Sequence, residues 1–136
     1  MIQEAYVSFE TAKLLKEKGF DEVGIGFYTP EKELHQTLLG ESNSIWKDAS
    51  ISAPTQQMAM RWLREVHNLV ICAELANENN KGNTDYTNPD RWYWFFDLTN
   101  EKGVVIEPES DYILNEFDSY EDAVEAAIQY CLTKLL

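Results

Sequence analysis

Two stretches of this sequence repeat the same spacing of apolar residues, at i, i+3, i+4, i+7, i+8 and i+11. This spacing places the side chains on one face of an α-helix. Within 53–67 the stripe consists of Thr55, Met58, Ala59, Trp62, Leu63 and Val66. Within 120–136 it consists of Val124, Ala127, Ile128, Cys131, Leu132 and Leu135. Burying one large aliphatic side chain contributes about 1.5–3 kcal/mol. Both helices must therefore cover a common apolar surface.

The residues at the ends of these stretches also favour helices. Ser52 can cap the first helix and Pro54 suits its first turn, while Asn68 suits the left-handed residue that ends it. Ser119 can cap the second helix. We expect the polar side of that helix to consist of Glu121, Asp122, Glu125 and Gln129.

The apolar surface available to both helices is a set of strands. Leu69–Leu75 is an apolar run typical of a strand buried on both faces in its first half. Trp92–Thr99 and Val104–Ile106 are the next strands, and residues 100–103 connect them as a hairpin. Consecutive strands joined in this way form an antiparallel meander. The sequence therefore predicts an α+β fold, a three- or four-stranded, mainly antiparallel sheet with two or three helices packed on one face.

The N-terminal residues predict a third helix. Ser8 suits its N-cap and Gly19 the left-handed position that closes it. We expect the 8–19 helix to pack against the same layer or an edge. No linker or internal repeat divides the chain, so residues 1–136 are expected to form a single acidic domain.

Residues 20–51 are patterned less clearly. Val23–Tyr28 is short and interrupted by glycine, which favours a weak or edge strand. Residues 40–44 fit a loop. One or two helical turns fit the spacing of Leu34, Leu38 and Leu39.

The chain carries 24 acidic and 11 basic residues, a formal net charge of −13. Binding to nucleic acid or to an anionic membrane needs a cationic face that releases counterions, so we expect neither as a direct partner. No apolar run approaches the ~20 residues of a membrane helix, and no secretory signal opens the sequence. The two cysteines, Cys72 and Cys131, fit reduced, buried thiols. These features predict a cytoplasmic protein.

No motif that carries chemistry is present. His35 and His67 are far apart in the sequence, and no local zinc spacing occurs, so we expect no metal. The segment 77–88 begins like a calcium loop, but it has a lysine at the fifth ligand position and no glutamate at the twelfth. The carboxylates of 107–111 fit a solvated acidic loop better than a metal site. Nucleotide-binding and nucleophile motifs are missing, so we expect no cofactor and no catalytic residue.

The aromatic run 92–96 is the most distinctive local feature. Strand alternation divides it into two sets. We expect the helices to cover the set Trp92, Trp94 and Phe96. The opposite face carries Tyr93, Phe95 and Asp97. This second face is either covered by the 8–19 helix or loops, or it is a partly open surface that binds another protein or a second copy of the chain.

Two further hypotheses start from charged residues. Arg64 and His67 lie three residues apart on helix 53–67, so a pocket between this helix and the sheet would use them with nearby carboxylates to hold a ligand or substrate. The plainer interpretation of His67 is a helix-end residue that interacts with terminal carbonyls. The segment 107–125 contains eight carboxylates and no base. Such a stretch is either a solvated face or an imitation of the DNA backbone that occupies the cationic groove of a nucleic-acid-binding protein.

Three segments carry a recognisable pattern. Ala53–Asn68 begins Ala-Pro-Thr and ends Trp-Leu-Arg-Glu-Val-His-Asn, Trp92–Leu98 is an aromatic strand, and Ser119–Ala127 begins Ser-Tyr-Glu. Together with the helix Phe9–Gly19 they resemble small uncharacterised proteins encoded by phages and prophages of gut Bacteroides-type bacteria. The resemblance implies an origin in a mobile element, and it implies no activity and no functional residue. Residues 76–91 are where this chain departs most from that pattern.

These observations favour a non-enzymatic, phage-derived accessory protein. We expect it to act on a protein partner through its acidic face or its aromatic sheet surface, and a basic partner or a homodimer would both fit. The alternatives are a small ligand-binding domain or enzyme with a pocket beside helix 53–67, and a DNA mimic.

Overall fold

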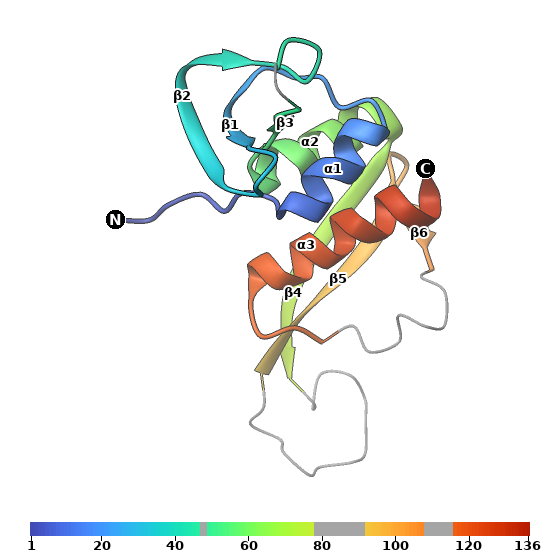
Figure 1. Ribbon diagram of the computed structural model, residues 1–136. Helices are drawn as coiled ribbons and strands as arrows, with labels where there is room; N and C mark the ends of the chain where they lie inside the picture. Colours follow the sequence, from blue (N-terminus) through green and yellow to red (C-terminus); the bar gives the residue numbers. More distant parts are fainter. Residues whose placement is uncertain (47–48, 78–91, 108–115) are drawn as a thin grey trace.

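The computed structural model describes residues 1–46, 49–77, 92–107 and 116–136, and Figure 1 shows their arrangement. The helices in these ranges are α1 (Phe9–Glu17), α2 (Gln56–His67) and α3 (Tyr120–Tyr130), and α3 continues into a π-helical segment, Cys131–Leu135. The strands are β1 (Gly24–Tyr28), β2 (Leu34–Glu41), β3 (Ile51–Ser52), β4 (Leu69–Asn77), β5 (Trp92–Asn100) and β6 (Val105–Ile106).

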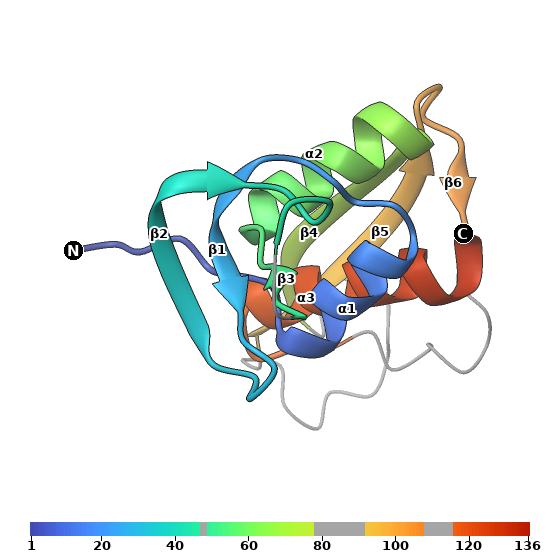
Figure 2. The same ribbon diagram turned by 45° about the horizontal axis from the view of Figure 1, so that its top comes forward.

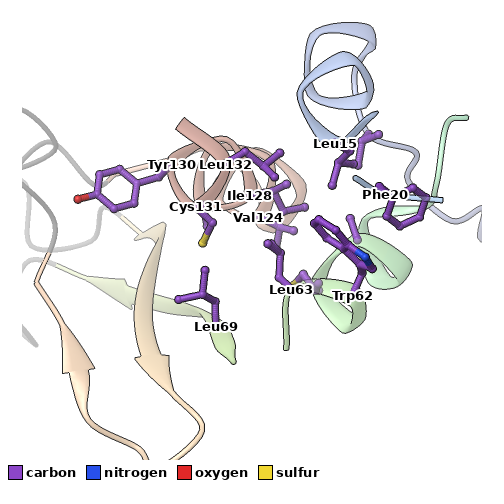
Figure 3. Close-up of a cluster of buried hydrophobic side chains, with 14 of the residues drawn as sticks. Leu15, Phe20, Trp62, Leu63, Leu69, Val124, Ile128, Tyr130, Cys131 and Leu132 are labelled. Atoms are coloured by element: carbon purple, nitrogen blue, oxygen red, sulfur yellow. The ribbon is translucent and has the colours of Figure 1, made fainter. Parts of the chain in front are cut away.

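The C-terminal sheet is the antiparallel meander that the sequence predicts, in the order β4-β5-β6. Its register places Ala73 opposite Phe96, so both side chains lie on one face. Both α2 and α3 contact this sheet and each other. Trp62 of α2 and Ile128 of α3 belong to the same buried cluster, part of which Figure 3 shows. The α+β prediction is confirmed, with the two helices sharing one core.

A second antiparallel sheet, β2-β1-β3, lies at the N-terminal end of the fold and is absent from the sequence prediction. β1 is its middle strand, so the prediction of an edge strand is wrong. The helical turns expected around residue 38 are also wrong, because this segment is β2. Leu38 and Leu39 are 101% and 79% exposed, so their spacing reflects no buried helix face. They lie where the β1–β2 register shifts, between Gly24 and Gly26 on the facing strand.

Most helix ends follow the predicted chemistry. The hydroxyl of Ser8 accepts the N–H of Thr11 at 3.2 Å, and the hydroxyl of Ser119 accepts the N–H of Asp122 at 3.0 Å. Asn68 ends α2 with a left-handed φ of +57°.

The cap of α2 differs from the prediction. Thr55 occupies the N-cap position and accepts the N–H of Met58 at 3.2 Å. Ser52 instead lies in β3, where its hydroxyl accepts the indole N–H of Trp46 at 2.6 Å. Pairing with β1 holds Ser52 in an extended strand, so the helix begins three residues later than a Ser52 cap requires.

The first helix packs on α3, on its π-helical extension and on β3 (Figure 2). This packing covers part of the predicted polar side of the last helix. Glu125 Oε1 accepts the backbone N–H of Ser8 at 2.9 Å, and Gln129 Nε2 donates to Thr11 Oγ1 at 2.9 Å. The polar side of this helix is therefore half-buried at Glu125 and Gln129 and exposed at Glu121 and Asp122.

The two thiols lie in different environments. Cys131 is buried, and desolvation raises its pKa to about 12. Cys72 is exposed on β4, so the expectation of a buried thiol and of a strand covered on both faces is wrong there. No helix in the described ranges is both long enough and apolar enough to cross a membrane.

Candidate functional site

The apolar stripe of α2 is wider than the core that covers it. Ala59 and Leu63 are fully buried, whereas Met58 is 39% exposed and Val66 is 55% exposed. The buried side of the helix includes Met60 instead. α2 is thus rotated relative to the sequence expectation, and one flank of its stripe faces outward.

Two cavities lie against this flank. One, of about 280 Å³, is lined by the N-terminal segment, β1 and the start of α2. The other, of about 250 Å³, lies beside the middle of α2. They share Glu22 and Met58, so they adjoin, and we call the combined depression the α2 groove. Its lining residues are Glu4, Tyr6, Phe20, Glu22, Val23, Gly24, Ile25, Gly26, Ser52, Pro54, Thr55, Met58, Arg61, Trp62, Glu65 and Val66.

The floor of the α2 groove is held rigidly. A Cβ atom at Gly26 would come within 2.5 Å of the Ala53 carbonyl oxygen and 2.6 Å of Cε1 of Tyr6, so only glycine lets these groups approach the strand. Backbone hydrogen bonds tie the same strip together. The N–H of Ala53 donates to the Gly26 carbonyl at 2.9 Å, and the N–H of Val7 donates to the Pro54 carbonyl at 3.0 Å.

The charged side chains of the groove are mainly acidic and lie at its rim. Arg61 Nε is 2.9 Å from Glu65 Oε1, so the basic group is already neutralised by its neighbour on α2. Glu4 and Glu22 are exposed, and neither forms an ion pair with any residue in the described ranges. The groove therefore combines an apolar floor with unbalanced negative charge.

Arg64 and His67, the pair proposed from the sequence, do not form a pocket. Arg64 is exposed, and neither residue lines the α2 groove. His67 packs edge-on against Trp62 with ring centroids 4.6 Å apart, and its Nε2 is buried without a hydrogen-bond partner. Trp62 also packs edge-on against Phe20 at 5.4 Å. His67 is therefore part of the aromatic packing beneath the groove, and the predicted bond to terminal carbonyls is not formed.

The aromatic face of β5 is only partly open. The register places Tyr93, Phe95 and Asp97 on the face away from Phe96, as predicted. Tyr93 is 2% exposed, so at this residue the alternative of a covered face holds and that of an open surface does not. Phe95 is half-buried and Asp97 is exposed. On the helix face Phe96 is buried as predicted, while Trp92, at the end of the strand, is 57% exposed.

Several predicted features lie wholly or partly outside the described residues. These are the calcium-like segment after residue 77, most of the carboxylates of 107–111, and the middle of the acidic stretch 107–125. Within the described ranges no group of three His, Cys, Asp or Glu side chains could hold a metal ion.

Three groups outside the lining of the groove have shifted pKa values. Burial raises the pKa of Glu125, although the Ser8 N–H opposes this by donating to the carboxylate. Burial, together with the charge of Glu125, also raises the pKa of Tyr28. The backbone N–H of Ser44 lowers the pKa of Asp21. None of these three residues lines the α2 groove.

Val23, just before β1, and Ile25, within β1, also line the groove and are 66% and 47% exposed, although neither was predicted to belong to a site. The sequence signal that could have identified them is the apolar residue on either side of Gly24. A segment this short does not need both residues to form a core. Met58 and Val66 were identified, but as core residues. The chain matches no protein-family model, no curated protein and no solved structure.

Proposed function

We propose that this protein is a non-enzymatic binding module that holds a segment of another protein in the α2 groove. The observation that carries the proposal is the outward-facing flank of α2, where Met58 and Val66 line a depression instead of the core. Apolar side chains that line a depression instead of the core support a contact site.

The form of the groove supports a peptide segment over a small molecule. Small-molecule sites direct a few polar groups at an enclosed ligand. In the α2 groove the charged side chains of Glu4 and Glu22 are instead exposed at the rim. A floor that is already ordered lowers the entropy cost of association, which suits recognition of a flexible segment.

We also propose that this module is an accessory protein of a mobile element, because its sequence resembles phage and prophage proteins. The acidic segment 107–125 remains a second proposed contact surface, as does the half-open sheet face at Phe95 and Asp97.

Selection from a random library of displayed peptides tests the proposed function. Val66→Asn removes an apolar side chain from the groove, and Val105→Asn is its matched control, since these valines are 55% and 56% exposed. Peptides enriched on the wild-type protein should lose most of their binding to Val66→Asn and keep it with Val105→Asn. The proposal fails if no enriched peptide distinguishes the two variants.

A further inference from the structure

The charges around the α2 groove assign a chemical class to its occupant. We infer that the groove binds a peptide segment in which apolar residues are flanked by lysine or arginine. This inference rests on the proposed function and adds the identity of the partner's side chains.

The lining of the groove sets two requirements for a ligand. Ile25, Met58 and Val66 offer apolar side chains that are 39–55% exposed, so the ligand must supply apolar groups to cover them. Glu4 and Glu22 lie at the rim without an ion-pair partner in the described part of the chain. Cationic side chains beside the apolar groups would meet these carboxylates.

The charge of the whole chain favours the same ligand. The formal net charge of −13 attracts a cationic segment from solution and repels an acidic one. A second copy of this chain is a poor occupant for the same reason. Pairing two α2 grooves would bring four unbalanced rim carboxylates together and add two charges of −13.

The apolar floor and the acidic rim have different effects on binding. Burial of the apolar side chains supplies most of the affinity, while exposed ion pairs each change it by about 1.4- to 5-fold. The rim therefore selects among apolar peptides by their charge, and this selection weakens as salt is added.

Three synthetic 12-residue peptides test the inference. They share two central leucines and differ only at four flanking positions, which are all lysine, all glutamine or all glutamate. Fluorescence anisotropy at low salt should show that the lysine peptide binds about tenfold tighter than the glutamine peptide, and that the glutamate peptide binds weakest. Met58→Gln should weaken binding of the lysine peptide severalfold. Leu75→Gln, at a side chain that is 47% exposed on β4, should leave this affinity unchanged.

A charge reversal at the rim separates this inference from general attraction to an acidic protein. Glu22→Lys should reduce the preference for the lysine peptide. Glu31→Lys is the control, because it changes the net charge by the same amount at an exposed residue outside the groove, and it should reduce the preference less. If both reversals have the same effect, the rim does not select the ligand and the inference is overturned.

Two other outcomes also overturn the inference. If all three peptides bind equally and lose affinity with Met58→Gln, the groove binds apolar segments without regard to charge, and the proposed function stands alone. If sedimentation shows a dimer of the chain that Met58→Gln dissociates, the groove belongs to a second copy. Failure of all peptides to bind overturns the inference, while the library selection decides the proposed function independently.

Discussion

The two sheets of this protein use apolar residues in opposite ways. In β4-β5-β6, Phe96 and Leu98 face α2 and α3 and are almost completely buried. In β2-β1-β3, Ile25, Leu38 and Leu39 are 47%, 101% and 79% exposed. The first sheet is covered by two helices with matching stripes, whereas the second lies to one side of the core (Figures 1 and 2). Phe96 and Leu98 of the C-terminal sheet therefore stabilise the core, whereas these three residues of the N-terminal sheet contribute little to it.

The α2 helix joins the two regions. Its buried side, with Ala59 and Leu63, belongs to the core, and its outward flank, with Met58 and Val66, belongs to the groove. Substitutions on opposite sides of one helix therefore test the stability of the core and the proposed binding separately.

Truncation of matched isoleucines gives the largest expected difference. Ile128→Ala removes a fully buried side chain and should cost about 2–5 kcal/mol of unfolding free energy. Ile25→Ala removes an exposed side chain and should change stability by less than about 1 kcal/mol. Urea unfolding measures both values. Equal losses would mean that Ile25 contributes to the core, and the contrast between the two sheets would be wrong.

Two glycines of β1 give the next largest contrast. Gly26→Ala places a Cβ against the Ala53 carbonyl and the Tyr6 ring, and forcing these groups apart should cost about 1–3 kcal/mol. At Gly24 no atom lies within 4 Å of an added Cβ, so Gly24→Ala should be neutral or slightly stabilising. Thermal unfolding compares the two variants. Should Gly26→Ala unfold at the wild-type temperature, the close packing of Tyr6 on β1 is wrong.

The Glu125 carboxylate makes stability depend on pH. Burial is the larger effect on its pKa and raises it above 4.5, against the opposing N–H of Ser8. The folded state therefore holds this proton more tightly than the unfolded state does. This difference in proton binding contributes to the free energy of unfolding. The contribution is fully present below pH 4.5 and is lost as the pH rises through the raised pKa of Glu125.

Glu125→Gln removes this titration while its amide oxygen still accepts the Ser8 N–H. Relative to the variant, the wild-type protein should lose stability as the pH rises above 4.5, measured as the difference in urea midpoints. Glu121→Gln removes an exposed carboxylate from the same helix and controls for the change in net charge. The same pH dependence in both variants would contradict a specific effect of Glu125.

The smallest expected effect is a difference in reactivity between the two thiols. Cys131 lies in the core with a pKa raised to about 12 by burial, whereas Cys72 is exposed on the outer face of β4. A thiol reagent should therefore label one cysteine per native chain rapidly and the second only after unfolding. Rapid labelling of both thiols in the native protein would show that the core under α3 is open.

Local chemistry explains which features were predictable. The caps at Ser8 and Ser119, the left-handed Asn68 and the stripe of α3 each depend on residues within a few positions of one another, and all four are confirmed. The α2 cap was misplaced because Ser52 and Thr55 both suit an N-cap. Only the pairing of β3 with distant β1 excludes Ser52.

The sequence by itself determined the three helices and the antiparallel meander, because each has a periodicity or a turn signal within one segment. Tertiary structure alone decided that residues 34–41 form a strand, that α1 covers Glu125, and that Met58 and Val66 face a groove. The physical reason is that an apolar stripe specifies a helix face but not how much surface another element has to cover it. Where that surface ends on α2, part of the stripe faces the groove instead of the core.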